Sequence, residues 1–343
     1  MGKSILVTGS AGFIGYHVAK RLTLEGHEVF GIDNLNNYYD PDLKQARLND
    51  IGVRHLLSAR WGQVVQSSKY PGFSFMRADL TDRATTCNLF AKRHFHSVVH
   101  LSAQAGVLHS LEDPWSYIDS NILGSLNVLE GCRSTNVRHL VFASSSSVYG
   151  LSEKRPSFSV LDNTDKPASL YGATKKSLEV MAYAYSNLYN LPATGLRLFT
   201  VYGPWGRPDM AIFRFVDSIL KGVPIHVFNH GIMARDFTYI DDVVESVCRV
   251  INHPARQDRS GIPYRLYNVG RSEPVSLATL VQEIEKALGK EALMEFLPFQ
   301  NGDTTYTCAD VSDFVSEYGY RPKVSIPEGV ALFVDWYRNY YGI

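Results

Sequence analysis

A glycine-rich turn between an apolar strand and a helix is the feature of this chain that most constrains its fold. Residues 4–8 form a short apolar run, which Gly9, Gly12 and Gly15 follow, and a helical pattern then continues to Gly26. Gly9 permits a tight turn, Gly12 lets phosphates approach the backbone, and Gly15 permits close packing of the helix on the strand. The helix N-terminus presents free N–H groups to an anion. The pattern therefore predicts a unit that binds the diphosphate of a dinucleotide.

The alternation of strand and helix continues through the first 200 residues. We predict strands at residues 4–8, 28–32, 73–76, 97–101, 139–143 and 193–199, and helices at residues 12–25, 83–93, 116–134 and 171–189. Strands that alternate with helices indicate a parallel sheet with helices on both faces. The fold class is therefore α/β, with a doubly wound parallel sheet of the Rossmann type.

After residue 200 prolines become frequent and the predicted helices and strands become shorter. We predict a dinucleotide-binding domain over residues 1–200 and a smaller α/β substrate domain over residues 201–343, with a segment near residues 235–260 as a candidate to rejoin the first domain. Residues 34–71 form a polar connection that is too long for an ordinary loop. A helical lid over the cofactor and a surface insertion without function are both consistent with this connection.

An acidic residue at the end of the second predicted strand distinguishes the two nicotinamide cofactors. Asp33 follows the glycine turn by about 20 residues, where a carboxylate can bind both hydroxyls of an adenosine ribose and repels a 2′-phosphate. The alternative is an aspartate that only caps a turn. We therefore predict NAD rather than NADP. The predicted cofactor contacts are Gly9, Gly12, Phe13, Ile14, Gly15, Asp33, Asn34, Asp79, Leu80, Leu101 and Lys175.

A tyrosine and a lysine one helical turn apart are the candidate acid/base pair. Tyr171 and Lys175 lie in the predicted 171–189 helix, and their i,i+4 spacing places both side chains on one face. A neighbouring ammonium favours the phenolate and lowers the tyrosine pKa from about 10. An isolated pair of this kind is commonly two surface residues, but the glycine turn upstream favours hydride chemistry. Serines 144–147 end a predicted strand, where they are either a polar terminus or donors to a substrate hydroxyl.

Charge and cysteine content argue against several other classes of protein. Lys+Arg and Asp+Glu both number 34, so the formal net charge is zero and nucleic acid or an acidic membrane is a poor partner. The four cysteines have no CxxC spacing, which is typical of buried thiols in a reducing compartment, and we predict no metal site. No signal peptide and no apolar run of about 18 residues is present. We expect a cytoplasmic globular protein.

Longer motifs carry a family resemblance that covers nearly the whole chain. They stand at residues 9–15, 33–40, 104–107, 144–150, 171–175, 195–210, 227–231 and 235–242. Together they resemble the extended short-chain dehydrogenase/reductase superfamily and, among its nucleotide-sugar epimerases, the UDP-glucuronate 4-epimerases. The resemblance implies that Tyr171, as phenolate, takes the proton of the sugar 4-hydroxyl while hydride leaves C4 for NAD⁺ and later returns to the other face. It implies that Lys175 sustains the phenolate and that Ser145 hydrogen-bonds the reacting oxygen.

The resemblance also implies which residues select the substrate. Ser146 and Ser147 stand where the 4,6-dehydratases and UDP-glucuronate decarboxylases carry acids, which disfavours both of those reactions. Galactose-type epimerases usually carry Asn where this chain has Thr200. Together with the two serines, Thr200 forms a hydroxyl cluster able to hold a C6 carboxylate. Family arginines near the sugar and diphosphate correspond to Arg207 and Arg235, whose alternative is an exposed surface position.

Two stretches depart from the family pattern. Leu108-His109-Ser110 replaces the Arg-Tyr-Ser of the uronate epimerases, which removes a cation, and residues 301–310 differ around Asp303, the counterpart of a uridine-ribose ligand. We predict an NAD-dependent 4-epimerase of a UDP-sugar, with UDP-glucuronate and UDP-galacturonate as the first pair. The alternatives are neutral UDP-hexoses (UDP-glucose or UDP-N-acetylglucosamine) or an inactive nucleotide-binding regulatory protein. The family further implies polysaccharide biosynthesis and a homodimer through the helices at residues 116–134 and 171–189.

Overall fold

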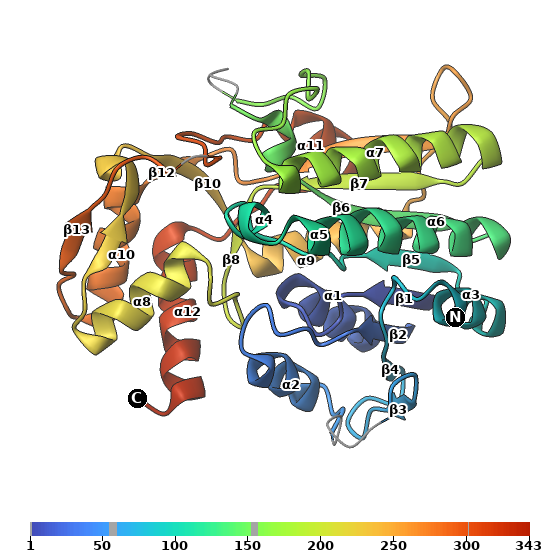
Figure 1. Ribbon diagram of the computed structural model, residues 1–343, viewed down its shortest axis with the longest axis horizontal. Coiled ribbons are helices and arrows are strands. Elements are labelled where there is room, and N and C mark those ends of the chain that lie inside the picture. Colours follow the sequence, from blue (N-terminus) through green and yellow to red (C-terminus); the bar gives the residue numbers. More distant parts are fainter. Residues whose placement is uncertain (1, 55–59, 152–156, 301) are drawn as a thin grey trace.

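The computed structural model describes residues 2–54, 60–151, 157–300 and 302–343, in which eight strands form one large sheet (Figure 1). In sheet order the strands are β11 (Tyr264–Val269), β7 (Ala193–Leu198), β6 (His139–Ser145), β5 (Ser97–His100), β1 (Ser4–Thr8), β2 (Glu28–Asp33), β4 (Phe73–Arg77) and β3 (Val64–Gln66). Neighbouring strands are parallel except for the edge strand β3, which runs antiparallel to β4. The predicted doubly wound α/β class is confirmed.

Helices cover both faces of this sheet, which explains why its central strands are buried along their whole length. On one face α3 (Arg83–Arg93), α6 (Gly124–Ser134) and α7 (Leu170–Tyr189) pack together, and on the other α1 (Phe13–Leu24) packs on α9 (Ile240–Asn252). Every residue of β5, β6 and β7 is buried. A strand that is buried on both faces has no solvent side to show the alternating pattern of an exposed sheet.

The predicted 116–134 helix is divided in the structure. It consists of α5 (Pro114–Ile118), a π-helical turn (Asp119–Leu123) and α6. Asn121 lies in the π-helical turn, and its side-chain amide donates to the Gln104 carbonyl at 3.0 Å and to Thr174 Oγ1 at 2.9 Å. The wider turn therefore directs a polar side chain inward, toward helix α7, as π-bulges at functional sites often do.

The 34–71 connection contains helix α2 (Pro41–Asp50) and strand β3 within its described part. Asp40 caps α2 by accepting a hydrogen bond from the Asp42 N–H, and Pro41 occupies the first helical position. The described part of the connection thus holds one helix and one strand, while residues 55–59 lie outside the described part of the chain.

The C-terminal part forms a smaller α/β unit beside the sheet. Its elements are β8 (Thr200–Tyr202), α8 (Ala211–Lys221), β9 (Ile225–Val227), β10 (Ala234–Tyr239), β12 (Pro274–Ser276), α10 (Leu277–Leu288), β13 (Met294–Phe296) and α12 (Ile326–Tyr341). Helix α11 (Ser312–Tyr318) packs instead on β11 of the large sheet. Strand β10 pairs with β8 and β12, and β13 pairs with β9. Between residues 235 and 260 it is helix α9 that packs on α1 and β6, whereas the strand that joins the large sheet, β11, comes later.

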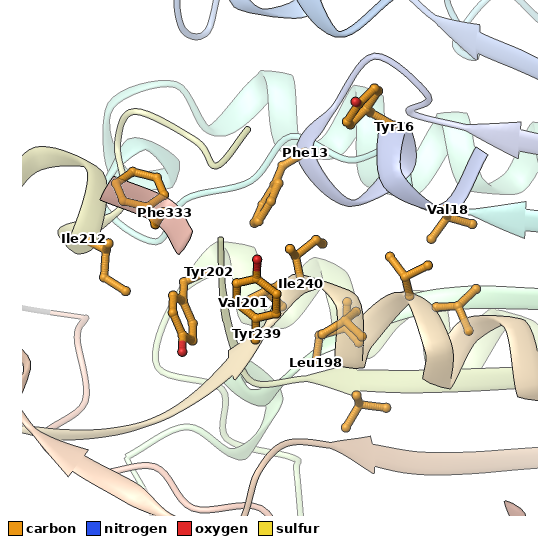
Figure 2. Close-up of a cluster of buried hydrophobic side chains, with 14 of the residues drawn as sticks. Phe13, Tyr16, Val18, Leu198, Val201, Tyr202, Ile212, Tyr239, Ile240 and Phe333 are labelled. Atoms are coloured by element: carbon orange, nitrogen blue, oxygen red, sulfur yellow. The ribbon is translucent and has the colours of Figure 1, made fainter. Parts of the chain in front are cut away.

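A shared hydrophobic core joins the two parts. Figure 2 shows Phe13 at the start of α1 among side chains of the C-terminal part, including Ile240 of α9 and Phe333 of α12. These side chains are at most 5% exposed. Burial of this much apolar surface holds the glycine turn firmly against the C-terminal elements. No helix in the described ranges is both long and apolar enough to span a membrane.

Candidate active site

One large cavity of about 1020 Å³ opens at the carboxyl ends of the parallel strands. Ligands of open α/β sheets bind at this edge. Most of the predicted site residues line the cavity: Gly9, Gly12, Phe13, Ile14, Gly15, Asp33, Asn34, Leu101, Ser145, Ser146, Ser147, Tyr171, Lys175, Thr200, Arg207, Arg235 and Asp303. Asp79 and Leu80 instead line a small recess beside Asn34. Asp79 is nevertheless connected to the cavity, because the side-chain amide of Asn34, which lines the cavity, donates to the Asp79 carboxylate at 2.9 Å.

The glycine turn leaves no room for larger residues. Gly9 has a φ of +70°, and a Cβ there lies 2.9 Å from the backbone of Ser102. A Cβ on Gly15 lies 2.0 Å from the Gly9 carbonyl oxygen, so the close helix–strand packing requires glycine. Asp33 lines the cavity and also accepts hydrogen bonds from two backbone N–H groups, of Ala11 at 3.2 Å and Leu35 at 2.8 Å. Asp33 therefore both caps the turn, as in the alternative interpretation, and lines the cavity.

Ser145, Tyr171 and Lys175 come together from two adjacent elements. Ser145 is the last residue of β6, and Tyr171 and Lys175 lie in the first turns of α7, where Ser169 caps the helix by accepting from the Gly172 N–H at 3.1 Å. The Ser145 hydroxyl donates to Ser147 Oγ at 3.1 Å and lies near enough to the Tyr171 phenol to lower the phenol pKa. The Lys175 ammonium lies 6.0 Å from the centre of the Tyr171 ring and donates to the Ala143 carbonyl at 3.0 Å.

Burial changes the expected protonation of the catalytic pair. Desolvation raises the pKa of Tyr171 above its ordinary value, although the Arg207 cation and the Ser145 hydroxyl oppose this. Burial, with a smaller contribution from Arg207, lowers the pKa of Lys175 to about 8. The predicted net lowering of the tyrosine pKa by Lys175 is therefore wrong for the protein without ligands. Sequence spacing shows that the two groups are neighbours but does not show how strongly each is desolvated.

The substrate end of the cavity holds two arginines, each bound to a carboxylate. Arg207 makes two hydrogen bonds to Asp209, Nε to Oδ1 at 3.0 Å and Nη2 to Oδ2 at 2.5 Å. Arg235 donates to Asp303 at 2.9 Å. The two arginine side chains are only 22% and 16% exposed, so neither is an ordinary surface residue. Asp303 thus lines the cavity, where it is the ion-pair partner of Arg235. Residue 301, two positions earlier, lies outside the described part of the chain.

The structure adds cavity residues that were missed in the sequence. Tyr38 and Lys44 reach the cavity from the 34–71 connection, and Asp209 comes from the loop after β8. The Tyr38 hydroxyl donates to Asp209 at 3.1 Å. Tyr38 lies in a motif that carried the family resemblance, but no spacing rule connects it with a residue so distant in sequence. Leu108 and His109, noted as departures from the family, also line the cavity.

Metal ligation is not suggested by the described side chains. Across the described ranges, no group of three or more His, Cys, Asp or Glu residues is placed to hold a metal ion. The arrangement instead offers a phenol, an ammonium and a hydroxyl in a cavity that two guanidinium groups also line. Such a set can move a proton at a sugar hydroxyl and bind oxyanions.

The fold and the Ser–Tyr–Lys site define an enzyme of short-chain dehydrogenase/reductase architecture. A family model described as "NAD dependent epimerase/dehydratase family" matches residues 5–270, and the chain belongs to this family.

Named relatives extend the comparison. The chain is 46% identical to "Protein CapI" of Staphylococcus aureus over 98% of this chain and 99% of that protein. It is also 46% identical to "UDP-glucuronate 4-epimerase 1" of Arabidopsis thaliana over 99% of this chain and 78% of that protein. Among solved structures, UDP-glucuronic acid 4-epimerase from Bacillus cereus, in complex with UDP-glucuronic acid and NAD, has a TM-score of 0.84 and 31% identity, covering 98% of this chain and 100% of that one.

Proposed function

We propose that this protein is an NAD-dependent UDP-sugar 4-epimerase that interconverts UDP-glucuronate and UDP-galacturonate. The observation that carries the proposal is the meeting of Ser145, Tyr171 and Lys175 in a cavity that the glycine turn also lines. Full-length similarity to proteins named as UDP-glucuronate 4-epimerases supports the same reaction. A regulatory protein without turnover has no need for this arrangement of acid/base groups.

The residues divide the work of a reversible oxidation. When bound, the cofactor would supply the redox chemistry, with NAD⁺ taking hydride from C4 and the resulting NADH returning it. Tyr171 accepts the proton of the C4 hydroxyl, and Ser145 holds the oxygen through the change from hydroxyl to ketone and back. Lys175 stabilises the phenolate electrostatically, because its ammonium lies 6.0 Å from the centre of the Tyr171 ring. The glycine turn and Asp33 hold the dinucleotide, with Asn34, Asp79, Leu80 and Leu101 around its adenosine end.

Hydroxyl groups at the inner wall favour a uronate. Ser146, Ser147 and Thr200 line the cavity, and their hydroxyls can donate to a C6 carboxylate without a fixed countercharge. Arg207 and Arg235 are then available to the diphosphate once it competes with their carboxylate partners. Leu108, which lines the cavity where the uronate epimerases carry arginine, is the observation that favours the second candidate, a 4-epimerase of neutral UDP-hexoses.

Separate incubation with UDP-glucuronate and with UDP-glucose distinguishes the two candidates. The products are resolved by chromatography that separates the C4 epimers. We expect UDP-galacturonate from the first incubation and little UDP-galactose from the second. Conversion of UDP-glucose alone refutes the uronate assignment, and no conversion of either sugar by the NAD-loaded protein refutes the enzyme.

A Thr200→Val variant tests the hydroxyl cluster. Valine keeps the shape of threonine and removes the hydroxyl, so we expect the KM for UDP-glucuronate to rise by about tenfold or more, as for the loss of a hydrogen bond to a charged group. Turnover of a neutral UDP-sugar, where measurable, is expected to change little. Steady-state kinetics on both substrates checks this, with Thr279→Val, on the exposed start of α10, as the matched control. Equal losses on both sugars would contradict a role in carboxylate recognition.

We further propose a cytoplasmic homodimer that assembles through α6 and α7 and serves polysaccharide biosynthesis. Apolar side chains on these helices are exposed in the single chain: Leu126, Val180, Tyr183 and Leu188. Exposed apolar surface on adjacent helices is typical of a subunit interface. The four cysteines are free thiols, which suits a reducing compartment. Sedimentation of the purified protein tests the dimer, and a monomer at micromolar concentration would refute it.

A further inference from the structure

The 34–71 connection makes close contact with the loop that carries Arg207. Arg47 of α2 is completely buried, and its guanidinium donates to the Trp205 carbonyl at 2.6 Å and to the Gly206 carbonyl at 3.3 Å. The same guanidinium donates to the Ala11 carbonyl in the glycine turn at 2.9 Å. One buried cation therefore links the cofactor turn to the 205–209 loop. These acceptors are neutral carbonyl groups, so the hydrogen bonds fix the position of the backbone and do not neutralise the charge of the buried guanidinium.

A second contact reaches the same loop nearer the cavity. The Tyr38 hydroxyl donates to Asp209 at 3.1 Å, and the Tyr38 ring lies 4.8 Å from the His109 ring. The Arg207 guanidinium carbon lies 5.9 Å from the centre of the Tyr38 ring. Gly106, with a φ of +109°, makes room for this tyrosine, because a Cβ there lies 2.4 Å from the Tyr38 hydroxyl. The ring is thus enclosed by the 205–209 loop, α4 (His109–Glu112) and the 104–107 turn.

The 205–209 loop carries Arg207 and Asp209, the two charged residues that influence the pKa of Tyr171. Burial by itself would raise the pKa of Asp209. The charge of Arg207, together with the hydrogen bonds from Arg207 and Tyr38, outweighs burial and holds that pKa below its usual value. Arg207 lowers the pKa of Tyr171, and this influence is larger than the opposing one of Asp209. The titratable and charged groups around Tyr171 are Lys175 on its own helix, Tyr117 on α5, His109 and Glu112 on α4, Tyr38, and the Arg207–Asp209 pair.

We propose that Tyr38 and Arg47 are positioning residues that hold the 205–209 loop, and with it the Arg207–Asp209 pair, beside the catalytic Tyr171. The proposal rests on the proposed 4-epimerase function, in which Tyr171 is the acid/base. It assigns a role to the 34–71 connection: this segment sets the electrostatic environment of the catalytic phenol through two contacts at opposite ends of one loop.

A Tyr38→Phe variant tests the proposal with the smallest change. It keeps the ring against His109 and Arg207 and removes the donor to Asp209. When the loop loosens, Arg207 favours the phenolate less, so the tyrosine pKa rises. The acidic limb of the pH profile of kcat then moves to higher pH, by about half a unit. At neutral pH we expect kcat to fall by at most about threefold, the factor that half a pKa unit allows, with the bound NAD unchanged and a smaller change in KM.

Two further measurements separate a positioning role from a general loss of structure. In an Arg207→Met background, which removes the cation, the Tyr38→Phe change is expected to have little further effect on kcat, because Tyr38 acts through Arg207. Tyr341→Phe removes the hydroxyl of a tyrosine on α12 that is 46% exposed, and it is expected to match the wild type. Independent, additive losses in the double variant would overturn the proposal, as would an unchanged rate and pH limb in Tyr38→Phe.

Ionisation of Tyr171 can also be followed without turnover. The difference in phenolate absorbance between the NAD-loaded protein and its Tyr171→Phe variant reports this one tyrosine. Tyr38→Phe is expected to move that titration to higher pH by the same amount as the kinetic limb. If the wild type epimerises neither UDP-sugar, the proposed function fails, and this titration still decides the positioning role. A titration that Tyr38→Phe leaves in place overturns that role.

Discussion

Tyr171→Phe is expected to lower kcat for UDP-sugar epimerisation by about 10²- to 10⁴-fold, the range typical for loss of a general acid/base. Phenylalanine keeps the buried ring but cannot accept the C4 proton. Neither neighbour replaces it: Ser145 has a hydroxyl that ionises far above working pH, and the Lys175 ammonium donates to the Ala143 carbonyl. NAD content is expected to stay at the wild-type level, because the glycine turn and Asp33, which are the predicted dinucleotide contacts, are unchanged.

Initial rates with each UDP-sugar, together with the NAD released on denaturation, measure this effect. Tyr189→Phe is the matched control, since it removes a hydroxyl from the same helix at a position that is 51% exposed. Retained turnover in Tyr171→Phe would mean that another group moves the proton. Loss of NAD along with turnover would show instead that the variant disturbs the cofactor site.

Glu179→Leu is expected to lower the free energy of unfolding by about 3–5 kcal/mol, as for other buried ion pairs that lose one partner. Glu179 on α7 and Arg197 on β7 are each 2% exposed and joined by two hydrogen bonds, Nε to Oε1 at 2.8 Å and Nη2 to Oε2 at 2.9 Å. Ser144, beside the catalytic Ser145, donates to the same carboxylate at 2.6 Å. Leucine leaves the guanidinium buried without its counter-ion.

A double variant shows whether the cost comes from the uncompensated charge. Glu179→Leu with Arg197→Met removes both charges, and we expect it to recover much of the lost stability in urea unfolding. Lys221→Met is the control, because it breaks an ion pair whose lysine is 65% exposed and is expected to cost at most about 1 kcal/mol. A double variant as unstable as Glu179→Leu would place the cost in packing rather than in charge.

Local patterns were sufficient to predict the Rossmann half of the fold. Strand β1 begins and ends at the predicted residues, and α3 does so too, because apolar strand runs, glycine turns and helix caps act over a few residues. The π-helical turn at 119–123 was not predictable in this way. The residues there fit a continuous helix, and the bulge depends on contacts that Asn121 makes with Gln104 and Thr174.

Spacing within single strands and helices was enough to predict the fold class, the glycine turn and the Tyr171–Lys175 pair, and the family resemblance added Ser145. How the protonation of these groups is tuned depends on the folded protein. The rise in the pKa of Tyr171 follows from burial by the whole fold, which outweighs the opposing effect of Arg207. The links from Tyr38 and Arg47 to the 205–209 loop join residues far apart in the chain. Such pairs arise only when the folded elements meet, since no short-range pattern specifies which distant polar groups become neighbours.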